Sequence, residues 1–195
     1  MIMKLKTWVE ERSVFLYKFL RSPKQIGSIT PSSKELAMAM LEPIQWQSTY
    51  AIAELGAGTG AVTKYIPSAA RSGTKVILFE KDAYLRGKLS VRFPDYSCYA
   101  DCLLLENALE QEGVEKLDCI ISGLPFFNFQ QEVRDRLIQQ IVASLKDDGL
   151  FIAFQYSQQM KRQLTEHFEI EVIRFVPLNI PPAFVYICRK KRVTG

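Results

Sequence analysis

Hydrophobic and polar positions along the chain follow two periods, and these periods alternate from residue 50 onward. Short apolar runs bounded by polar or turn residues predict seven strands, at 50–55, 75–80, 97–100, 117–122, 149–155, 169–177 and 183–189. Between them, apolar residues spaced three and four apart predict helices at 60–70, 83–93, 103–112, 131–146 and 157–167. Upstream, Ser32 or Ser33 can cap a short helix that runs through Leu41, with Glu35 in position for a capping box.

This order of elements predicts an α/β fold with a doubly wound sheet. The runs at 50–55 and 75–80 are almost continuously apolar, which is typical of parallel strands covered by helices on both faces. Strand–helix alternation at this spacing favours a mostly parallel seven-stranded sheet with right-handed crossovers. The last two strands leave no room for a helix between them. We therefore expect an antiparallel last strand, joined to its neighbour around residues 179–182.

We expect a single domain over residues 1–195, because the chain has no internal repeat and no low-complexity linker. The pattern divides it into an N-terminal amphipathic extension at 1–24, a core at 25–189 and a basic tail at 190–195. In the extension, residues 4–21 carry Trp, Phe and Leu side chains at helical spacing among lysines and arginines. Such a helix either lies in a bilayer interface or packs over a bound cofactor with its charges in water.

Charge is distributed unevenly along the chain. The net charge is +4, from 25 lysines and arginines against 21 aspartates and glutamates. Residues 1–30 hold six basic and two acidic side chains, and the run at 189–192 adds four basic ones. The remaining 15 basic and 19 acidic residues leave the body between them at −4. The basic run at the C-terminus is typical of a solvated tail, with membrane contact as the alternative.

Composition excludes several classes of protein. Apolar residues make up 48% of the chain and no uninterrupted apolar run exceeds six residues, so we expect a globular chain without a bilayer span. Glu10 and Glu11 interrupt any signal-peptide core. The cysteines lack a paired C-x-x-C pattern and His167 is the only histidine, which argues against a metal site. Reduced thiols favour a cytoplasmic location.

A glycine-rich segment, Glu54-Leu55-Gly56-Ala57-Gly58-Thr59-Gly60, joins the first of these strands to the following helix. Glycines at this place let backbone amides approach a ligand closely and allow backbone angles that side chains disfavour. Glu80 ends the second strand, where a carboxylate can accept hydrogen bonds from both hydroxyls of a ribose. Asp101 follows the third strand, where it can meet an adenine amino group. Together these residues predict a nucleoside site at the carboxyl edge of the sheet.

These motifs, with the fourth-strand segment 118–125, resemble the Rossmann-like methyltransferases that use S-adenosyl-L-methionine and release S-adenosyl-L-homocysteine. The resemblance covers roughly residues 25–189 and implies that Glu54 and the glycine loop surround the methionine part of the cofactor. It implies that Glu80 holds the ribose and that Asp101 with Cys102 meets the adenine. The cofactor-binding residues implied in full are Ile29, Thr30, Glu54, Gly56, Ala57, Gly58, Gly60, Glu80, Lys81, Asp101, Cys102, Ser122, Gly123 and Leu124.

The end of the fourth strand narrows the resemblance. The rRNA adenine dimethyltransferases have Asn-Leu-Pro-Tyr there, and the Asn holds the target amine, whereas this chain has Gly123-Leu124-Pro125-Phe126. The segment 122–128 instead resembles the bacterial phospholipid N-methyltransferases, which methylate phosphatidylethanolamine. The segments 27–33 and 179–186 resemble the same enzymes. The implied activity is N-methylation of a phospholipid head group, at the inner face of the membrane and with residues 4–21 on an anionic surface.

Aromatic residues supply the chemistry expected for such a substrate. The nucleophile is a neutral amine, and burial against aromatic walls lowers an amine's pKa by disfavouring its charged form. We expect Tyr156, Phe126 and Asn128 to be catalytic, and Phe127, Pro181 and Phe184 to contact the substrate. Core packing is the alternative for the phenylalanines. Two other functions stay open: RNA adenine N6-methylation, against which Gly123 argues, and cofactor binding or membrane association without catalysis.

Overall fold

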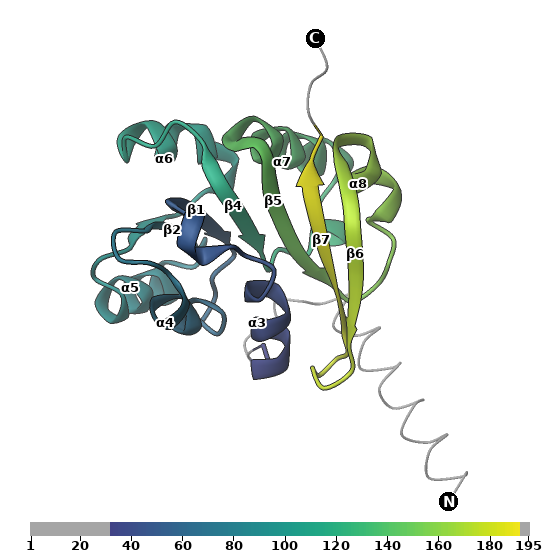
Figure 1. Ribbon diagram of the computed structural model, residues 1–195, viewed down its shortest axis with the longest axis horizontal. Coiled ribbons are helices and arrows are strands. Elements are labelled where there is room, and N and C mark those ends of the chain that lie inside the picture. The colour runs from purple at the N-terminus through teal and green to yellow at the C-terminus, as the bar shows by residue number, and fades with distance from the viewer. Residues whose placement is uncertain (1–31, 192–195) are drawn as a thin grey trace, which may run out of the picture.

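A computed structural model describes residues 32–191 of the chain (Figure 1). Its strands are β1 (Ala51–Leu55), β2 (Lys75–Phe79), β3 (Ser97–Tyr99), β4 (Leu117–Ser122), β5 (Leu145–Gln155), β6 (Phe168–Val176) and β7 (Ala183–Lys190). Its α-helices are α3 (Lys34–Leu41), α4 (Ile66–Ala69), α5 (Ala83–Arg92), α6 (Leu105–Gln111), α7 (Gln131–Ser144) and α8 (Lys161–His167). Short 3₁₀ turns are η1 (Trp46–Ser48), η2 (Thr63–Tyr65), η3 (Cys102–Leu104) and η4 (Phe126–Asn128). The predicted helix at 4–21 and the predicted cofactor residues Ile29 and Thr30 lie outside the described residues.

The predicted fold class is confirmed. The strands form one sheet in the order β3-β2-β1-β4-β5-β7-β6. Pairs among β1 to β5 are parallel, and β7 is antiparallel to both β5 and β6. The strand order reverses beside β1, the point at which doubly wound sheets bind ligands at their carboxyl edge. In Figure 1 this is the edge toward which β4 and β5 point and at which the β6–β7 hairpin turns.

Two hydrophobic clusters cover the two faces of the sheet. One joins α3, α4 and α5 to one face, and the other joins α6, α7 and α8 to the opposite face. Every residue of β1 is buried, which explains the continuous apolar run that predicted a central strand. The sheet is therefore the middle layer of three, and its carboxyl edge is left to loops.

Several helix predictions differ from the structure in their bounds. The helices predicted at 103–112 and 157–167 are the shorter α6 and α8. The predicted helix at 60–70 is only η2 followed by the single turn of α4, after turns over residues 58–62. The predicted helix at 131–146 ends at Ser144, because Leu145 is extended and pairs with Leu117 as the first residue of β5. Leu145 is fully buried. A buried apolar residue fits either the end of a helix or the start of a strand, so the apolar pattern does not distinguish the two.

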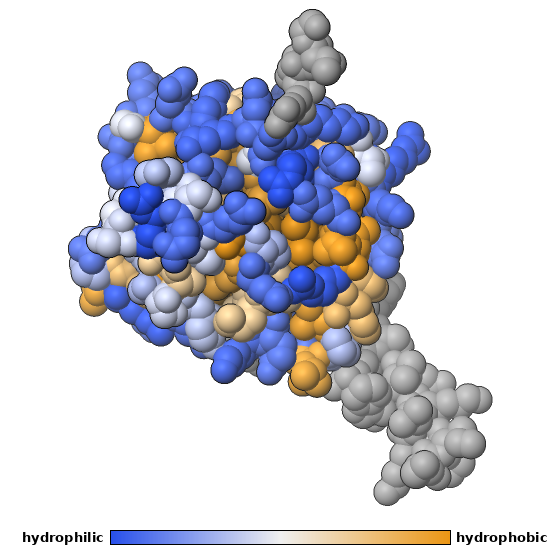
Figure 2. Space-filling view, in the orientation of Figure 1, coloured by the Kyte–Doolittle hydropathy of each residue, from blue (hydrophilic) through white to orange (hydrophobic). Residues whose placement is uncertain are grey.

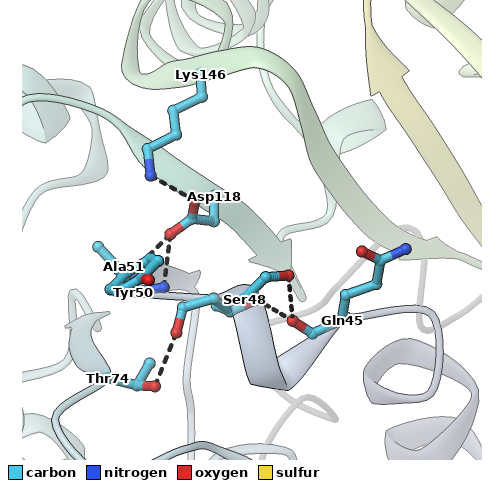
Figure 3. A network of polar contacts seen from close by, with 8 residues as sticks. Gln45, Ser48, Tyr50, Ala51, Thr74, Asp118 and Lys146 are labelled. Atoms are coloured by element: carbon cyan, nitrogen blue, oxygen red, sulfur yellow. Dashed lines mark hydrogen bonds and ion pairs between the residues drawn. The ribbon is translucent and has the colours of Figure 1, made fainter.

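The opposite, amino edge of the sheet is held by Asp118 of β4 (Figure 3). Its carboxylate accepts hydrogen bonds from the amides of Tyr50 and Ala51 at 2.7 and 2.9 Å, which sets the start of β1 against β4. Lys146 donates to the same carboxylate at 2.5 Å. Partial burial raises the pKa of Asp118, but these hydrogen bonds outweigh it and hold the pKa below its usual value.

The basic run at 189–192 is tied to the protein as far as the structure describes it. Arg189 and Lys190 belong to β7, which extends one residue beyond the predicted core. Arg189 pairs with Glu171, Lys190 donates to the carbonyl of Leu145 at 2.8 Å, and Lys191 donates to that of Thr165 at 2.7 Å. These cations therefore lie at the amino edge, away from the ligand-binding edge. Among the described residues, no helix has the length and apolar character needed to cross a membrane.

Candidate functional site

The loops that follow β1, β2 and β4 are joined to one another at the carboxyl edge. The amides of Gly56 and Ala57 donate to the carbonyl of Phe79 at 2.8 and 3.0 Å, and the amide of Gly123 donates to that of Leu55 at 2.9 Å. These contacts continue the sheet's ladder into the loops. The segments that the sequence singled out, 54–60, 80–81 and 122–124, are thus brought together in one place.

The glycine loop has the backbone geometry that its sequence predicts. Gly56, Gly58 and Gly60 have φ values of 75°, 57° and 77°, which side chains disfavour. A Cβ on Gly56 would lie 2.9 Å from the Leu124 side chain, so close packing of two loops also requires this glycine. A Cβ on Gly58 would meet nothing within 4 Å. The middle of the loop therefore borders open space, where a ligand can approach the backbone.

Glu80 closes this loop from the end of β2. Its Oε2 accepts a hydrogen bond from the backbone amide of Gly58 at 2.7 Å, and its Oε1 accepts one from the backbone amide of Asp82 at 2.9 Å. Each carboxylate oxygen has a second lone pair, so both can still accept from a ligand hydroxyl. Arg86 donates to the Glu80 carbonyl at 2.9 Å and holds the turn. Lys81 is exposed beside it.

Glu54 acts on the loop from within the core. Its side chain is 3% exposed, and its Oε2 accepts a hydrogen bond of 2.7 Å from the buried hydroxyl of Thr63. Burial raises the pKa of Glu54 to about 7, which the bond from Thr63 lowers and the charge of Glu80 raises. In this structure Glu54 links β1 to η2 and so holds both ends of the glycine loop. A direct contact of Glu54 with the cofactor stays a prediction.

Asp101 and Cys102 lie at the end of β3, next in order along the edge. Asp101 caps η3, with its Oδ1 accepting from the amide of Leu103 at 2.9 Å, and the residue is exposed. Burial raises the pKa of the Cys102 thiol to about 11, and the Asp101 charge adds to this. Cys102 is therefore a neutral thiol at neutral pH, suited to packing against a base.

The end of β4 is held by Ser122, which the sequence nominated, and by Gln155, which it did not. The buried hydroxyl of Ser122 accepts from the amide of Leu124 at 3.2 Å, and Gln155 at the end of β5 donates to the Leu124 carbonyl at 2.8 Å. A Cβ on Gly123 would lie 3.2 Å from the Gly56 carbonyl oxygen. Gln155, like Thr63, is a polar residue at the end of an otherwise apolar segment, and that signal was available in the sequence.

The predicted aromatic residues do not form one wall. Tyr156 packs edge-on against Phe154 at 5.7 Å between centroids, on the α3 side of the sheet. Phe126 is 1% exposed and packs with Phe151 on the opposite side, as a core residue does. Phe184 also packs on that opposite side. Their placement favours core packing for Phe126, and Tyr156 alone of these three lies with the α3 cluster.

The remaining predicted substrate residues are divided between two loops. Phe127 is exposed with the Arg134 guanidinium 5.0 Å from its ring centroid, and Asn128 beside it is also exposed. Pro181 is buried in the β6–β7 loop, where its carbonyl accepts from the Asn179 amide at 2.7 Å. Catalytic and substrate-binding roles for these residues stay predictions.

S-Adenosyl-L-methionine fits the residues that meet at this edge. The open space at Gly58 permits close backbone approach, and Glu80 presents two acceptor oxygens at the end of β2, one strand away. Asp101 adds a carboxylate at the end of β3. This donor and acceptor set suits a nucleoside with ribose hydroxyls and an exocyclic amine.

Comparison with known proteins gives a relative that spans nearly the whole chain. The ornithine lipid N-methyltransferase of Singulisphaera acidiphila is 32% identical over 181 residues, covering 90% of this chain and 94% of the relative. No protein-family model matches the chain.

Solved structures of methyltransferases share the fold. TrmN from Thermus thermophilus matches with a TM-score of 0.65 at 17% identity, over 88% of this chain and 52% of TrmN, so the chain spans about half of that protein. A SAM-dependent O-methyltransferase from Thermotoga maritima matches with a TM-score of 0.63 at 15% identity, over 91% of this chain and 72% of its own. At such identities the likeness shows the fold alone.

Sequence identity over nearly the full length of both proteins shows the family, as the glycine loop and Glu80 predicted. The chain belongs to the Rossmann-like methyltransferases that use S-adenosyl-L-methionine, in the family of the S. acidiphila ornithine lipid N-methyltransferase.

Proposed function

We propose that the protein transfers methyl groups from S-adenosyl-L-methionine to the amine of a membrane lipid head group. The observation that carries this proposal is the 32% identity to an ornithine lipid N-methyltransferase over 94% of that enzyme. The resemblance of the segments 122–128 and 179–186 to phospholipid N-methyltransferases supports the same class of substrate from the sequence.

The reaction needs a neutral amine held in line with the transferred methyl group. The bound cofactor supplies an electrophilic methyl on a sulfonium. The amine lone pair would form the new C–N bond as the C–S bond breaks, and the electron pair of the C–S bond would stay on sulfur. The methylated ammonium would then release a proton to water. Positioning and exclusion of water supply much of the rate in such a displacement.

Tyr156 suits a positioning contact with the amine. Burial raises the pKa of Tyr156 to about 12, so the phenol keeps its proton at neutral pH and does not serve as a base. A neutral phenol oxygen accepts a hydrogen bond from an amine N–H, which orients the nitrogen lone pair away from it. Tyr156 immediately follows Gln155, which binds the β4 loop, and this sequence neighbourhood supports its place near the reacting centre.

Two lipids are candidates for the substrate. An ornithine lipid is favoured by the S. acidiphila relative, and phosphatidylethanolamine is favoured by the motifs of the fourth strand and the β6–β7 loop. Both present a primary amine near an anionic group, so the catalytic chemistry is the same. An assay that supplies each lipid separately therefore distinguishes the two substrates.

RNA adenine methylation finds less support at the end of β4. That activity uses an Asn or Asp side chain where this chain has Gly123. A Cβ at this position would lie 3.2 Å from the Gly56 carbonyl oxygen and 3.3 Å from the Phe154 ring, so a side chain here would be tightly packed and would need these neighbours to shift by a few tenths of an ångström.

The test is methyl transfer from labelled cofactor to mixed micelles that contain either an ornithine lipid or phosphatidylethanolamine, with RNA as a parallel substrate. We expect label in one or both lipids and none in RNA. Label in RNA alone, or binding of the cofactor without transfer to any lipid, would contradict the proposal.

A further inference from the structure

The tip of the β6–β7 hairpin exposes apolar side chains and buries its polar one. Leu178 is 69% exposed and Ile180 is 50% exposed, whereas Asn179 between them is 3% exposed. The Asn179 side chain is turned inward by two hydrogen bonds, from the Ser33 amide at 3.0 Å and to the Pro181 carbonyl at 2.7 Å. The surface of the tip is therefore formed by the apolar side chains of Leu178 and Ile180, with the polar side chain between them bonded inside the protein.

The apolar character extends beyond the tip itself. Phe175 at the end of β6 is 53% exposed with its ring 5.1 Å from that of Phe184, and Pro177 is exposed. From Phe175 to Cys188 the chain carries no charged side chain. Figure 2 shows hydrophobic residues gathered over β6 and β7 and at the end of their hairpin. We refer to Phe175, Leu178 and Ile180 as the hairpin patch.

The hairpin patch lies at the edge where the candidate site lies. β6 runs in the direction of β5, because both are antiparallel to β7, so the hairpin turns at the carboxyl edge. The cations of Arg189, Lys190 and Lys191 are at the opposite edge and are engaged by the protein. The hairpin patch and the candidate site therefore lie on the same edge of the sheet.

The described part of the chain begins beside the hairpin patch, where the Ser33 amide binds Asn179. Residues 1–31 carry six basic and two acidic side chains, and this segment joins the described chain at Ser32, next to the Ser33 amide that binds Asn179. Lys34, which follows, is exposed. An apolar tip, in a chain whose first 31 residues carry net positive charge, suits a bilayer with anionic lipid, because apolar side chains favour the acyl boundary and cations favour anionic head groups.

We propose that the hairpin patch inserts into the membrane and sets the carboxyl edge of the sheet against the bilayer, so that a lipid head group enters the site without leaving the membrane. This proposal rests on the proposed function, because a lipid substrate is the reason to choose a membrane as the partner. It goes beyond that function by assigning membrane contact to Leu178 and Ile180, which are not among the residues predicted from the sequence.

The test uses the full chain and vesicles of phosphatidylcholine and phosphatidylglycerol. Leu178→Ser with Ile180→Ser should weaken vesicle binding by roughly tenfold, the effect of losing two partly inserted aliphatic side chains. Val91→Ser, a change at an exposed valine of α5, should leave binding unchanged. Binding of the double variant as tight as that of the unmodified chain, or no vesicle binding by the unmodified chain, would overturn the proposal.

A second measurement does not depend on the double variant folding well. In Leu178→Trp, the added fluorescence should be quenched by vesicles with brominated acyl chains, and in Val91→Trp it should not. Absence of quenching at position 178, as when another part of the chain or a second copy covers the tip, would overturn the proposal. Methyl transfer in mixed micelles is measured separately. Absence of methyl transfer would contradict the proposed function. The quenching result tests only whether the hairpin patch inserts into the membrane.

Discussion

Asn179 accepts a hydrogen bond from the backbone N–H of Ser33 at 3.0 Å, across a separation of 146 residues. Ser33 also caps α3, its hydroxyl accepting from the amide of Leu36 at 3.1 Å. One buried amide thus joins the β6–β7 loop to the start of the first described helix. The two motifs that resemble phospholipid N-methyltransferases at opposite ends of the chain meet at this bond.

Asn179→Ala should destabilise the protein by about 1–3 kcal/mol, because it leaves the Ser33 amide and the Pro181 carbonyl without this partner. The free energy of unfolding in urea measures the effect. Asn107→Ala, at an exposed position of α6, serves as the matched control. A loss no larger than that of the control would mean that the bond contributes nothing to the fold.

Glu80→Ala should weaken binding of S-adenosyl-L-homocysteine by roughly tenfold or more, because it removes the carboxylate that binds the Gly58 amide and that we propose accepts from the ribose hydroxyls. Calorimetric titration gives the affinity. Glu110→Ala, at an exposed carboxylate of α6, should bind as the unmodified chain does. Unchanged affinity in Glu80→Ala would show that the ribose lies elsewhere.

Glu54 should make the protein less stable as the pH rises. Burial raises the pKa of Glu54 to about 7, above its ordinary value of 4.5. Between pH 4.5 and 7 the folded state therefore holds a proton that the unfolded chain has lost. The stability that this proton contributes is complete below pH 4.5 and is lost as the pH rises through 7. Relative to Glu54→Gln, the unmodified chain should lose roughly 3 kcal/mol across this range.

Urea unfolding of both proteins at acidic and alkaline pH checks the direction for Glu54. The difference in the free energy of unfolding should grow with pH and then level off above the folded-state pKa. Glu110→Gln controls for changes at an exposed carboxylate. A difference that is constant with pH would place the Glu54 carboxyl in contact with water.

Tyr156→Phe should lower kcat by about tenfold and leave the affinity for S-adenosyl-L-homocysteine unchanged, since it removes the hydrogen bond that we propose Tyr156 makes with the amine. Steady-state kinetics with a lipid substrate in micelles measures this split. Tyr84→Phe, at an exposed tyrosine of α5, is the control. Equal loss of cofactor binding and turnover would assign Tyr156 to the cofactor instead.

The sequence predicted the sheet well because the strands are marked by burial on both faces. β1 and β4 are buried along nearly their whole length, and the glycines at 56, 58 and 60 have the positive φ that their pattern indicated. The helix after this loop is shorter than the predicted 60–70, because Thr63 lies in η2 and not in an α-helix. In the structure its buried hydroxyl binds Glu54 instead.

The arrangement of the substrate side was harder to predict, because position along a strand does not say which face a side chain takes at the strand's end. Tyr156 and Phe184 both follow or begin strands at the same edge, yet they pack with clusters on opposite faces. The register Gln155↔Phe184 between β5 and β7 sets this, and it emerges only when the strands pair.

The most direct test of the proposed function is mass spectrometry of lipids from cells that express the chain, compared with cells that express Glu80→Ala. In cells that express the unmodified chain, we expect an aminolipid whose head group has gained the mass of added methyl groups. In cells that express Glu80→Ala, we expect much less of this methylated lipid. An unchanged set of aminolipids in cells that make ornithine lipid and phosphatidylethanolamine, with the protein folded and its cofactor bound, would contradict the proposed function.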